Sequence, residues 1–132
     1  MNRRKVLAIL RMVPMIVVMG TIFILSAQPG DRFATALLPG IDKLAHAVAY
    51  GKLALTVLYV FSEDRKKNHP KTVMLLTVIF CVAFGVSDEF HQSYVPGRMA
   101  SVLDLAADCV GAVAASLLYY RWRERRRTLL PQ

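Results

Sequence analysis

Hydrophobic and polar positions follow each other in long blocks along the chain, with four apolar runs separated by short polar segments. The runs cover roughly residues 6–27, 43–61, 71–90 and 101–120. A helix needs about 20 mainly apolar residues to cross a bilayer, and each run has about that length. Because helices satisfy their own backbone hydrogen bonds in lipid, the pattern predicts an all-α fold. We expect a four-helix transmembrane bundle that forms one domain over residues 1–132.

Basic residues are clustered in a chain whose formal net charge is +8. Of its 17 Lys and Arg, 13 lie at the N-terminus, in the second loop and in the tail: Arg3, Arg4, Lys5, Arg11, Arg65, Lys66, Lys67, Lys71, Arg121, Arg123, Arg125, Arg126 and Arg127. The positive-inside rule places these three segments, and so both termini, in the cytoplasm. The expected location is a bacterial inner (plasma) membrane. The basic tail is then a topology anchor that contacts anionic lipid, and nucleic acid is not expected as a partner.

This orientation brings polar residues of all four predicted helices to the outer face. Side chains three or four residues apart share one face of a helix. The shared faces are His46 with Tyr50, then Asp88 with His91 and Gln92, and finally Asp104 with Asp108; Gln28, Lys43, Glu89 and Arg98 lie at the same level. Ionisable residues at membrane depth are costly and usually face a cavity or a partner. We therefore expect one polar site at the external face.

Small residues on the fourth predicted helix indicate how it packs. Ala107, Gly111 and Ala115 form a small-xxx-small stripe beside the line of Asp104 and Asp108. Such stripes let two helices approach closely in lipid. The carboxylates are therefore expected to point into the bundle.

An ordered set of motifs resembles the VanZ-like membrane proteins. The motifs are Ser26-x-Gln28-Pro29, Asp42-Lys43-x-x-His46-x-x-x-Tyr50, Ser87-Asp88-Glu89-x-His91-Gln92, Pro96-Gly97-Arg98 and Asp104-x-x-x-Asp108-x-x-Gly111. They cover roughly residues 23–115, and the family also uses Asn at the position of Asp108. The resemblance implies a membrane protein of the cell envelope, of a type linked to glycopeptide-antibiotic resistance, to teicoplanin rather than vancomycin. It implies no reaction.

Local structure offers alternative interpretations for some of these residues. Asp42 follows Pro39-Gly40 and suits a helix N-cap as well as a site role. Ser101-x-x-Asp104 resembles a capping box. Residues 95–98, with Pro96 and Gly97 in the middle, suit a type II turn. The group Asp88, Glu89 and His91 also fits a structural polar network, a reading that stays open.

Two functions fit the expected site. In the first, the protein binds an amphiphile (a lipid, a lipid-linked wall precursor or a lipidated glycopeptide), with Arg98 and Lys43 holding an anionic head group and Gln28 and Gln92 adding hydrogen bonds. In the second, it is an intramembrane hydrolase or transferase acting on a lipid-linked substrate. The catalytic candidates are then His46, Asp88, Glu89 and His91, with Arg98 stabilising developing charge; Tyr50, Asp104 and Asp108 complete the ligand-binding set.

Other functions are less well supported by the sequence. Transport is disfavoured by four helices without an inverted repeat, unless the protein forms a homo-oligomer. Cys81 and Cys109 lie in apolar runs without a CxxC motif, so they are expected to act as small hydrophobic residues. The acidic and histidine side chains are suitable ligand types, but they lack a recognised metal-binding spacing. We therefore predict no metal and no cofactor.

Overall fold

The computed structural model describes residues 3–29 and 40–129, with side chains from Val6 onward. Its helices are α1 (Arg3–Ser26), α3 (Ile41–Val60), α4 (Glu63–Asn68), α5 (Pro70–Gln92) and α6 (Val102–Leu129). No strand occurs in these two ranges, so the all-α prediction is confirmed for the described chain. The four predicted runs correspond to the four long helices.

Two differences from the predicted elements have local causes. The second loop contains the short helix α4, where the Ser62 hydroxyl accepts the Arg65 N–H at 3.3 Å and acidic residues occupy the first turn. Helix α6 continues to Leu129 rather than ending near residue 120, because its Arg-rich tail consists largely of good helix formers. At 1.5 Å per residue its 28 residues span about 42 Å, longer than a hydrocarbon core of about 30 Å.

Within residues 3–29 and 40–129, three helices are long and apolar enough to cross a membrane: Val6–Ser26, Pro70–Gln92 and Val102–Leu129. Helix α3 is not among them, because Asp42, Lys43, His46 and Lys52 interrupt its apolar sequence. The count of four spanning helices is therefore not confirmed, and the described residues contain three candidates. Large apolar side chains cover the outside of α1, including Leu10 and Ile24, as expected for a surface that faces lipid.

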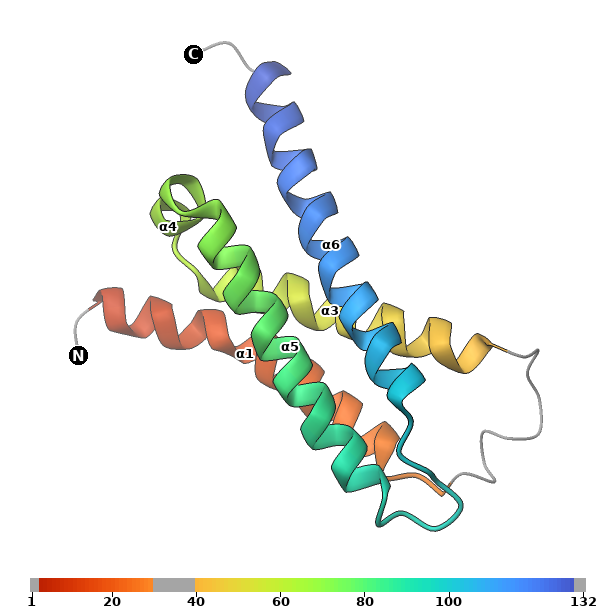
Figure 1. Cartoon of the computed structure of the whole chain (residues 1–132). Helices are drawn as coiled ribbons and strands as arrows, with labels where there is room; N and C mark the ends of the chain where they lie inside the picture. The colour runs from red at the N-terminus through yellow and green to blue at the C-terminus, as the bar shows by residue number, and fades with distance from the viewer. Residues whose placement is uncertain (1–2, 30–39, 130–132) are drawn as a thin grey trace.

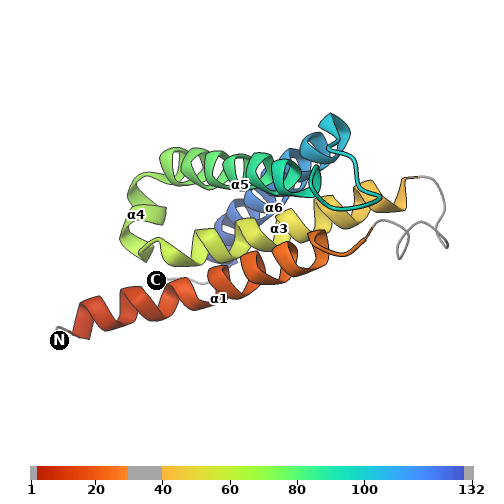
Figure 2. The same ribbon diagram turned by 90° about the horizontal axis from the view of Figure 1, so that it is seen from below.

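Helix α3 is the centre of the bundle. It contacts α1, α5 and α6, and its contact with α6 is the most extensive between any two described helices. Figure 2 shows α3 running between α1 and α5, while α6 crosses it and projects beyond the bundle at its C-terminal end (Figure 1). The buried apolar core includes Tyr50, Leu53 and Cys81. Cys81 is thus a small buried residue, as predicted.

Gly111 allows the close approach of α6 to α3 that the small-residue stripe predicts. A Cβ atom on Gly111 would lie only 2.0 Å from the backbone oxygen of Ala47. No side chain fits in that space, so the two backbones are in contact. His46 precedes Ala47 directly, and Asp108 lies one turn before Gly111, so this contact lies next to both residues.

At the end of the bundle that holds α4, an ion-pair cluster joins α4 to α6. Glu63 lies 2.5 Å from both Arg123 and Lys66, and both cations lie 5.8 Å from the centre of the Tyr119 ring. The Arg123 guanidinium, followed by the Lys66 ammonium, lowers the pKa of the Glu63 carboxyl to about 2. Basic residues of the second loop and of the tail therefore meet at one end of the fold.

Candidate functional site

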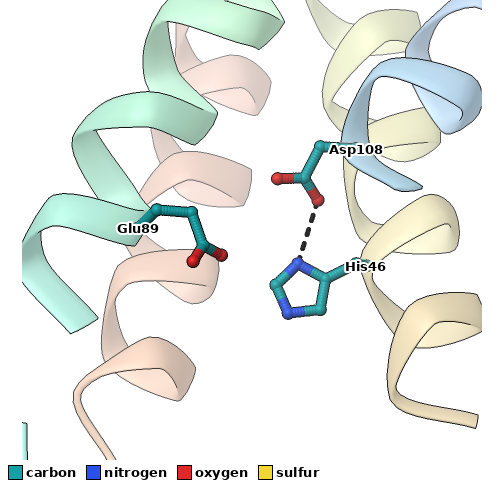
Figure 3. A group of neighbouring side chains, drawn as sticks. All are labelled: His46, Glu89 and Asp108. Atoms are coloured by element: carbon teal, nitrogen blue, oxygen red, sulfur yellow. Dashed lines mark hydrogen bonds and ion pairs between the residues drawn. The ribbon is translucent and has the colours of Figure 1, made fainter. Parts of the chain in front are cut away.

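The centre of the candidate site is formed by side chains of three helices. His46 of α3, Glu89 of α5 and Asp108 of α6 point toward one another (Figure 3), and each offers a ligand atom within 4.8 Å of the others. His46 Nδ1 lies 2.9 Å from Asp108 Oδ1, a hydrogen bond or ion pair. Asp108 is 1% exposed and Glu89 is 7% exposed. The sequence interpretation placed all three residues in the site, but it did not pair them.

Glu89 also holds the start of α6. Its Oε2 accepts the backbone N–H of Ser101 at 2.6 Å, while the Ser101 hydroxyl accepts the N–H of Asp104 at 3.3 Å. The predicted capping box is therefore half formed within α6. The second half, a carboxylate on the cap N–H, is supplied from α5 by Glu89 instead of by Asp104.

Asp104 is instead engaged by Lys43. The Lys43 ammonium pairs with Asp104 across α3 and α6, and with its neighbour Asp42 at 2.7 Å. Asp42 lies inside the first turn of α3, which is preceded by Gly40, so the interpretation of Asp42 as an N-cap is wrong. Lys43 is already balanced by two carboxylates within the chain.

Asp88 joins α1 to α5. Its Oδ2 accepts the Ser26 hydroxyl at 2.8 Å and the Gln92 amide at 3.0 Å, and all three side chains are buried. His91 lies on the neighbouring surface of α5, where it stacks on Phe23 with ring centres 4.3 Å apart. The three neighbouring side chains of α5 therefore face different helices. Asp88 and His91 contact α1, whereas Glu89 faces α3 and α6.

Arg98 lies at the edge of this region. The turn before it is the predicted type II turn, since Arg98 N–H donates to Val95 O at 3.1 Å and Gly97 has φ +75°. Arg98 Nε donates to the backbone oxygen of Gln28 at 3.3 Å. The turn therefore reaches back to the end of α1 (Figure 1). The expected role of Arg98 in holding an anionic head group stays a prediction.

Tyr50 lies one turn deeper than His46. The ring of Tyr50 is 1% exposed, and Gly85 leaves space for both this ring and Asp108 Oδ2. Lys52, further along α3, is exposed and forms no ion pair with the described residues.

The chain is similar to known proteins over most of its length. The family model for VanZ/LLP1 matches residues 10–123. The chain belongs to the VanZ/LLP1 family. An uncharacterized protein of the fission yeast Schizosaccharomyces pombe is 34% identical over 126 residues, which is 94% of this chain and 68% of that protein. No solved structure matches. The yeast relative gives no support to the expected bacterial origin.

Two contributors to the candidate site of this VanZ/LLP1 protein were not among the predicted site residues. Ser26 binds Asp88, and the backbone of Ser101 binds Glu89. Ser26 belongs to the Ser-x-Gln-Pro motif, which was a usable signal for the residue but not for its partner 62 positions away. The sequence explained Ser101 fully as a helix cap, so nothing indicated that its backbone also contacts α5.

The polar region of this VanZ/LLP1 chain retains buried atoms that have no hydrogen-bond partner among the described residues. They are Tyr50 OH, Asp88 Oδ1, Glu89 Oε1, His91 Nδ1 and Asp108 Oδ2. An unpaired buried polar group costs about 1–3 kcal/mol. Three of the five atoms are carboxylate oxygens, which only accept hydrogen bonds or bind cations when ionised. Chemically, the region suits a ligand rich in donors, or a cation.

Proposed function

We propose that this protein spans the membrane with both termini on the cytoplasmic side and binds the polar head group of an amphiphile at the opposite face. The five buried polar atoms without a partner among the described residues, gathered from α3, α5 and α6, carry this proposal. Inside a membrane-embedded bundle there is no water to form hydrogen bonds with such atoms, so a bound polar group would supply the missing hydrogen bonds.

The acceptor-rich character of the site narrows the ligand class. Lys43 already pairs with Asp42 and Asp104, so it has little charge left for an anionic head group. The open oxygens of Asp88, Glu89 and Asp108 accept from hydroxyl or amine donors. Sugar- or amine-bearing head groups, as on lipid-linked wall precursors and lipidated glycopeptides such as teicoplanin, have such donors.

The orientation is supported by the charge at the other end of the bundle. The ion-pair cluster of Glu63, Lys66 and Arg123 joins the basic second loop to the basic tail. The positive-inside rule puts that end in the cytoplasm. The region of His46, Glu89 and Asp108 then lies toward the outer leaflet.

The binding role is tested by the amphiphiles that co-purify with the protein. Asp88→Asn replaces an open acceptor oxygen, and losing a charged hydrogen bond of about 1.5–3 kcal/mol lowers affinity by roughly 10- to 150-fold. Mass spectrometry of lipids extracted from wild-type protein should show one enriched amphiphile that is depleted in Asp88→Asn. Glu124→Gln, an exposed acid on the α6 tail, is the matched control and should retain it. Identical lipid profiles for all three proteins would refute the binding role.

A catalytic role is the second candidate, favoured by the contact between His46 and Asp108. A buried carboxylate 2.9 Å from an imidazole nitrogen fixes the ring, as general acid–base sites require. Such an enzyme would be a hydrolase or transferase acting on a lipid-linked substrate. The co-purified amphiphile should then be converted during incubation of wild-type protein in detergent, and should persist unchanged with His46→Gln. An amphiphile that stays intact with both proteins, with and without an added lipid-linked acceptor, would exclude this role and leave binding.

A further inference from the structure

The cluster of His46, Glu89 and Asp108 has the composition of a metal site. It offers one imidazole nitrogen and two carboxylate oxygens, all within 4.8 Å of one another. Donors bound to one Zn²⁺ in tetrahedral geometry at about 2.0–2.2 Å lie about 3.3–3.6 Å apart, so the three side chains would have to draw together by up to about 1.5 Å. The three residues come from α3, α5 and α6, so an ion among them would connect the three helices (Figure 3).

Two oxygens in the cluster are buried and open. Asp108 Oδ2 and Glu89 Oε1 have no hydrogen-bond partner within the described part of the chain. Their residues are 1% and 7% exposed, so water reaches neither freely. Figure 3 shows both carboxylate groups facing the space between Glu89 and the His46–Asp108 pair. Their other oxygens, Glu89 Oε2 and Asp108 Oδ1, are held by Ser101 and His46, which fixes both groups in place.

Charge in this region is unbalanced. The buried or nearly buried acids are Asp88, Glu89, Asp104 and Asp108, and the lysine and arginine of the same region are Lys43 and Arg98. Among the described residues these four carboxyl groups face two cationic side chains, and Lys43 is shared with the exposed Asp42, so the acids outnumber the cations by at least two. Uncompensated charge at membrane depth is expensive. A divalent cation would cancel this excess.

We propose that His46, Glu89 and Asp108 bind a divalent transition-metal ion. A mixed nitrogen and oxygen donor set favours Zn²⁺ or Mn²⁺ over Mg²⁺ and Ca²⁺, which prefer oxygen ligands only. The three side chains leave coordination positions for an outside group. The ion would also contact the bound head group, because a phosphate, carboxylate or hydroxyl of that group would complete the coordination of the ion. This part of the inference rests on the proposed function.

Metal binding is measured directly on the full chain. Purified protein in detergent is treated with a chelator, equilibrated with Zn²⁺ or Mn²⁺, and its metal content is determined by plasma mass spectrometry. About one ion per chain is expected. Glu89→Gln and Asp108→Asn should each lower affinity by at least about tenfold, while Glu124→Gln should match wild type. Excess Mg²⁺ should not displace the ion.

A second pair of measurements reports on the ligands of the ion and on the coupling of metal binding to folding. Cobalt(II) bound to wild-type protein should give a visible absorption spectrum with a nitrogen ligand, and the spectrum should change in His46→Gln. Zn²⁺ should also raise the melting temperature of wild type and of Glu124→Gln, but not that of Glu89→Gln.

The outcomes separate this inference from the proposed function. Wild-type protein that binds neither Zn²⁺ nor Mn²⁺ but still co-purifies with its amphiphile would overturn the metal site and retain head-group binding. Equal metal affinity in wild type, Glu89→Gln and Asp108→Asn would also overturn it. Stoichiometric metal lost only in the ligand variants, without any retained amphiphile, would support the metal site and refute head-group binding.

Discussion

Gly111→Ala is expected to force α3 and α6 apart. The new Cβ would lie 2.0 Å from the Ala47 oxygen and 2.7 Å from both the carbonyl carbon and Cα of that residue. Real Cβ contacts are essentially never shorter than 3.0 Å, so the helices must separate locally by at least 3.0 − 2.0 = 1.0 Å. The obstacle is backbone, which cannot move aside as a flexible side chain can.

The expected effect has an energetic and a functional part. Overpacking of a tight contact costs about 1–3 kcal/mol, and we expect the upper half of this range. If the helices part as rigid bodies, the 2.9 Å contact of His46 with Asp108 lengthens to about 4 Å, beyond hydrogen-bonding distance. Gly111→Ala should therefore weaken head-group retention as well as stability, although Gly111 has no side chain in the site.

The chain provides its own controls for this experiment. A Cβ on Gly20 of α1 meets nothing within 4 Å, so Gly20→Ala should change stability only through helix propensity, a gain of up to about 1 kcal/mol. Gly51→Ala places its Cβ 3.4 Å from the Gly111 oxygen, an ordinary contact, and should be tolerated. Thermal unfolding in detergent would compare the three variants. A Gly111→Ala protein as stable as Gly20→Ala would refute the close approach of α3 to α6.

Three further predictions test other parts of the fold. Ser26→Ala should lower stability by about 1.5–3 kcal/mol because it removes a donor from a buried carboxylate, whereas Thr21→Ala, whose hydroxyl bonds only its own helix, should have little effect on unfolding. The ion pairs of Glu63 should stabilise the fold fully above about pH 4.5 and progressively less as the pH falls toward about 2, because folding lowers this pKa; the melting-temperature difference between wild type and Glu63→Gln should shrink over that range. Reporter fusions at Tyr94 should report the outside and fusions within α4 the cytoplasm, and the reverse pattern would contradict the proposed orientation.

The helices were predictable because the apolar runs are long and nearly uninterrupted. The end of α6 was not, since the Arg-rich tail has good helix propensity but no apolar pattern. Helix α4 was missed for a related reason. Its signals are the Ser62 cap and the order of acidic residues before basic ones, and they lie within a segment whose polar sequence is typical of a loop.

The candidate site was only partly predictable from the helical periodicity of the sequence. Helical spacing correctly put His46 and Asp108 on inward faces, but the rotation of each helix about its axis decides which inward residues meet. That rotation depends on the contact of Gly111 with Ala47, which only the assembled fold reveals. The proximity of His46, Glu89 and Asp108 was hidden for the same reason, because these residues are 43 and 19 positions apart, far from any familiar metal-binding spacing.

The polar sequence of α3 has a consequence for how the protein is made. Helix α3 is not apolar enough to count as a spanning helix by itself, and its partners Asp104 and Asp108 lie 61 and 62 residues later than Lys43 and His46. During synthesis α3 is therefore complete long before α6 can compensate its charges. The membrane-insertion machinery would have to keep the charged side chains of α3 away from lipid until α6 has been synthesised. A chain terminated after α5 should accordingly leave α3 poorly inserted and open to degradation, although every residue of α3 is present.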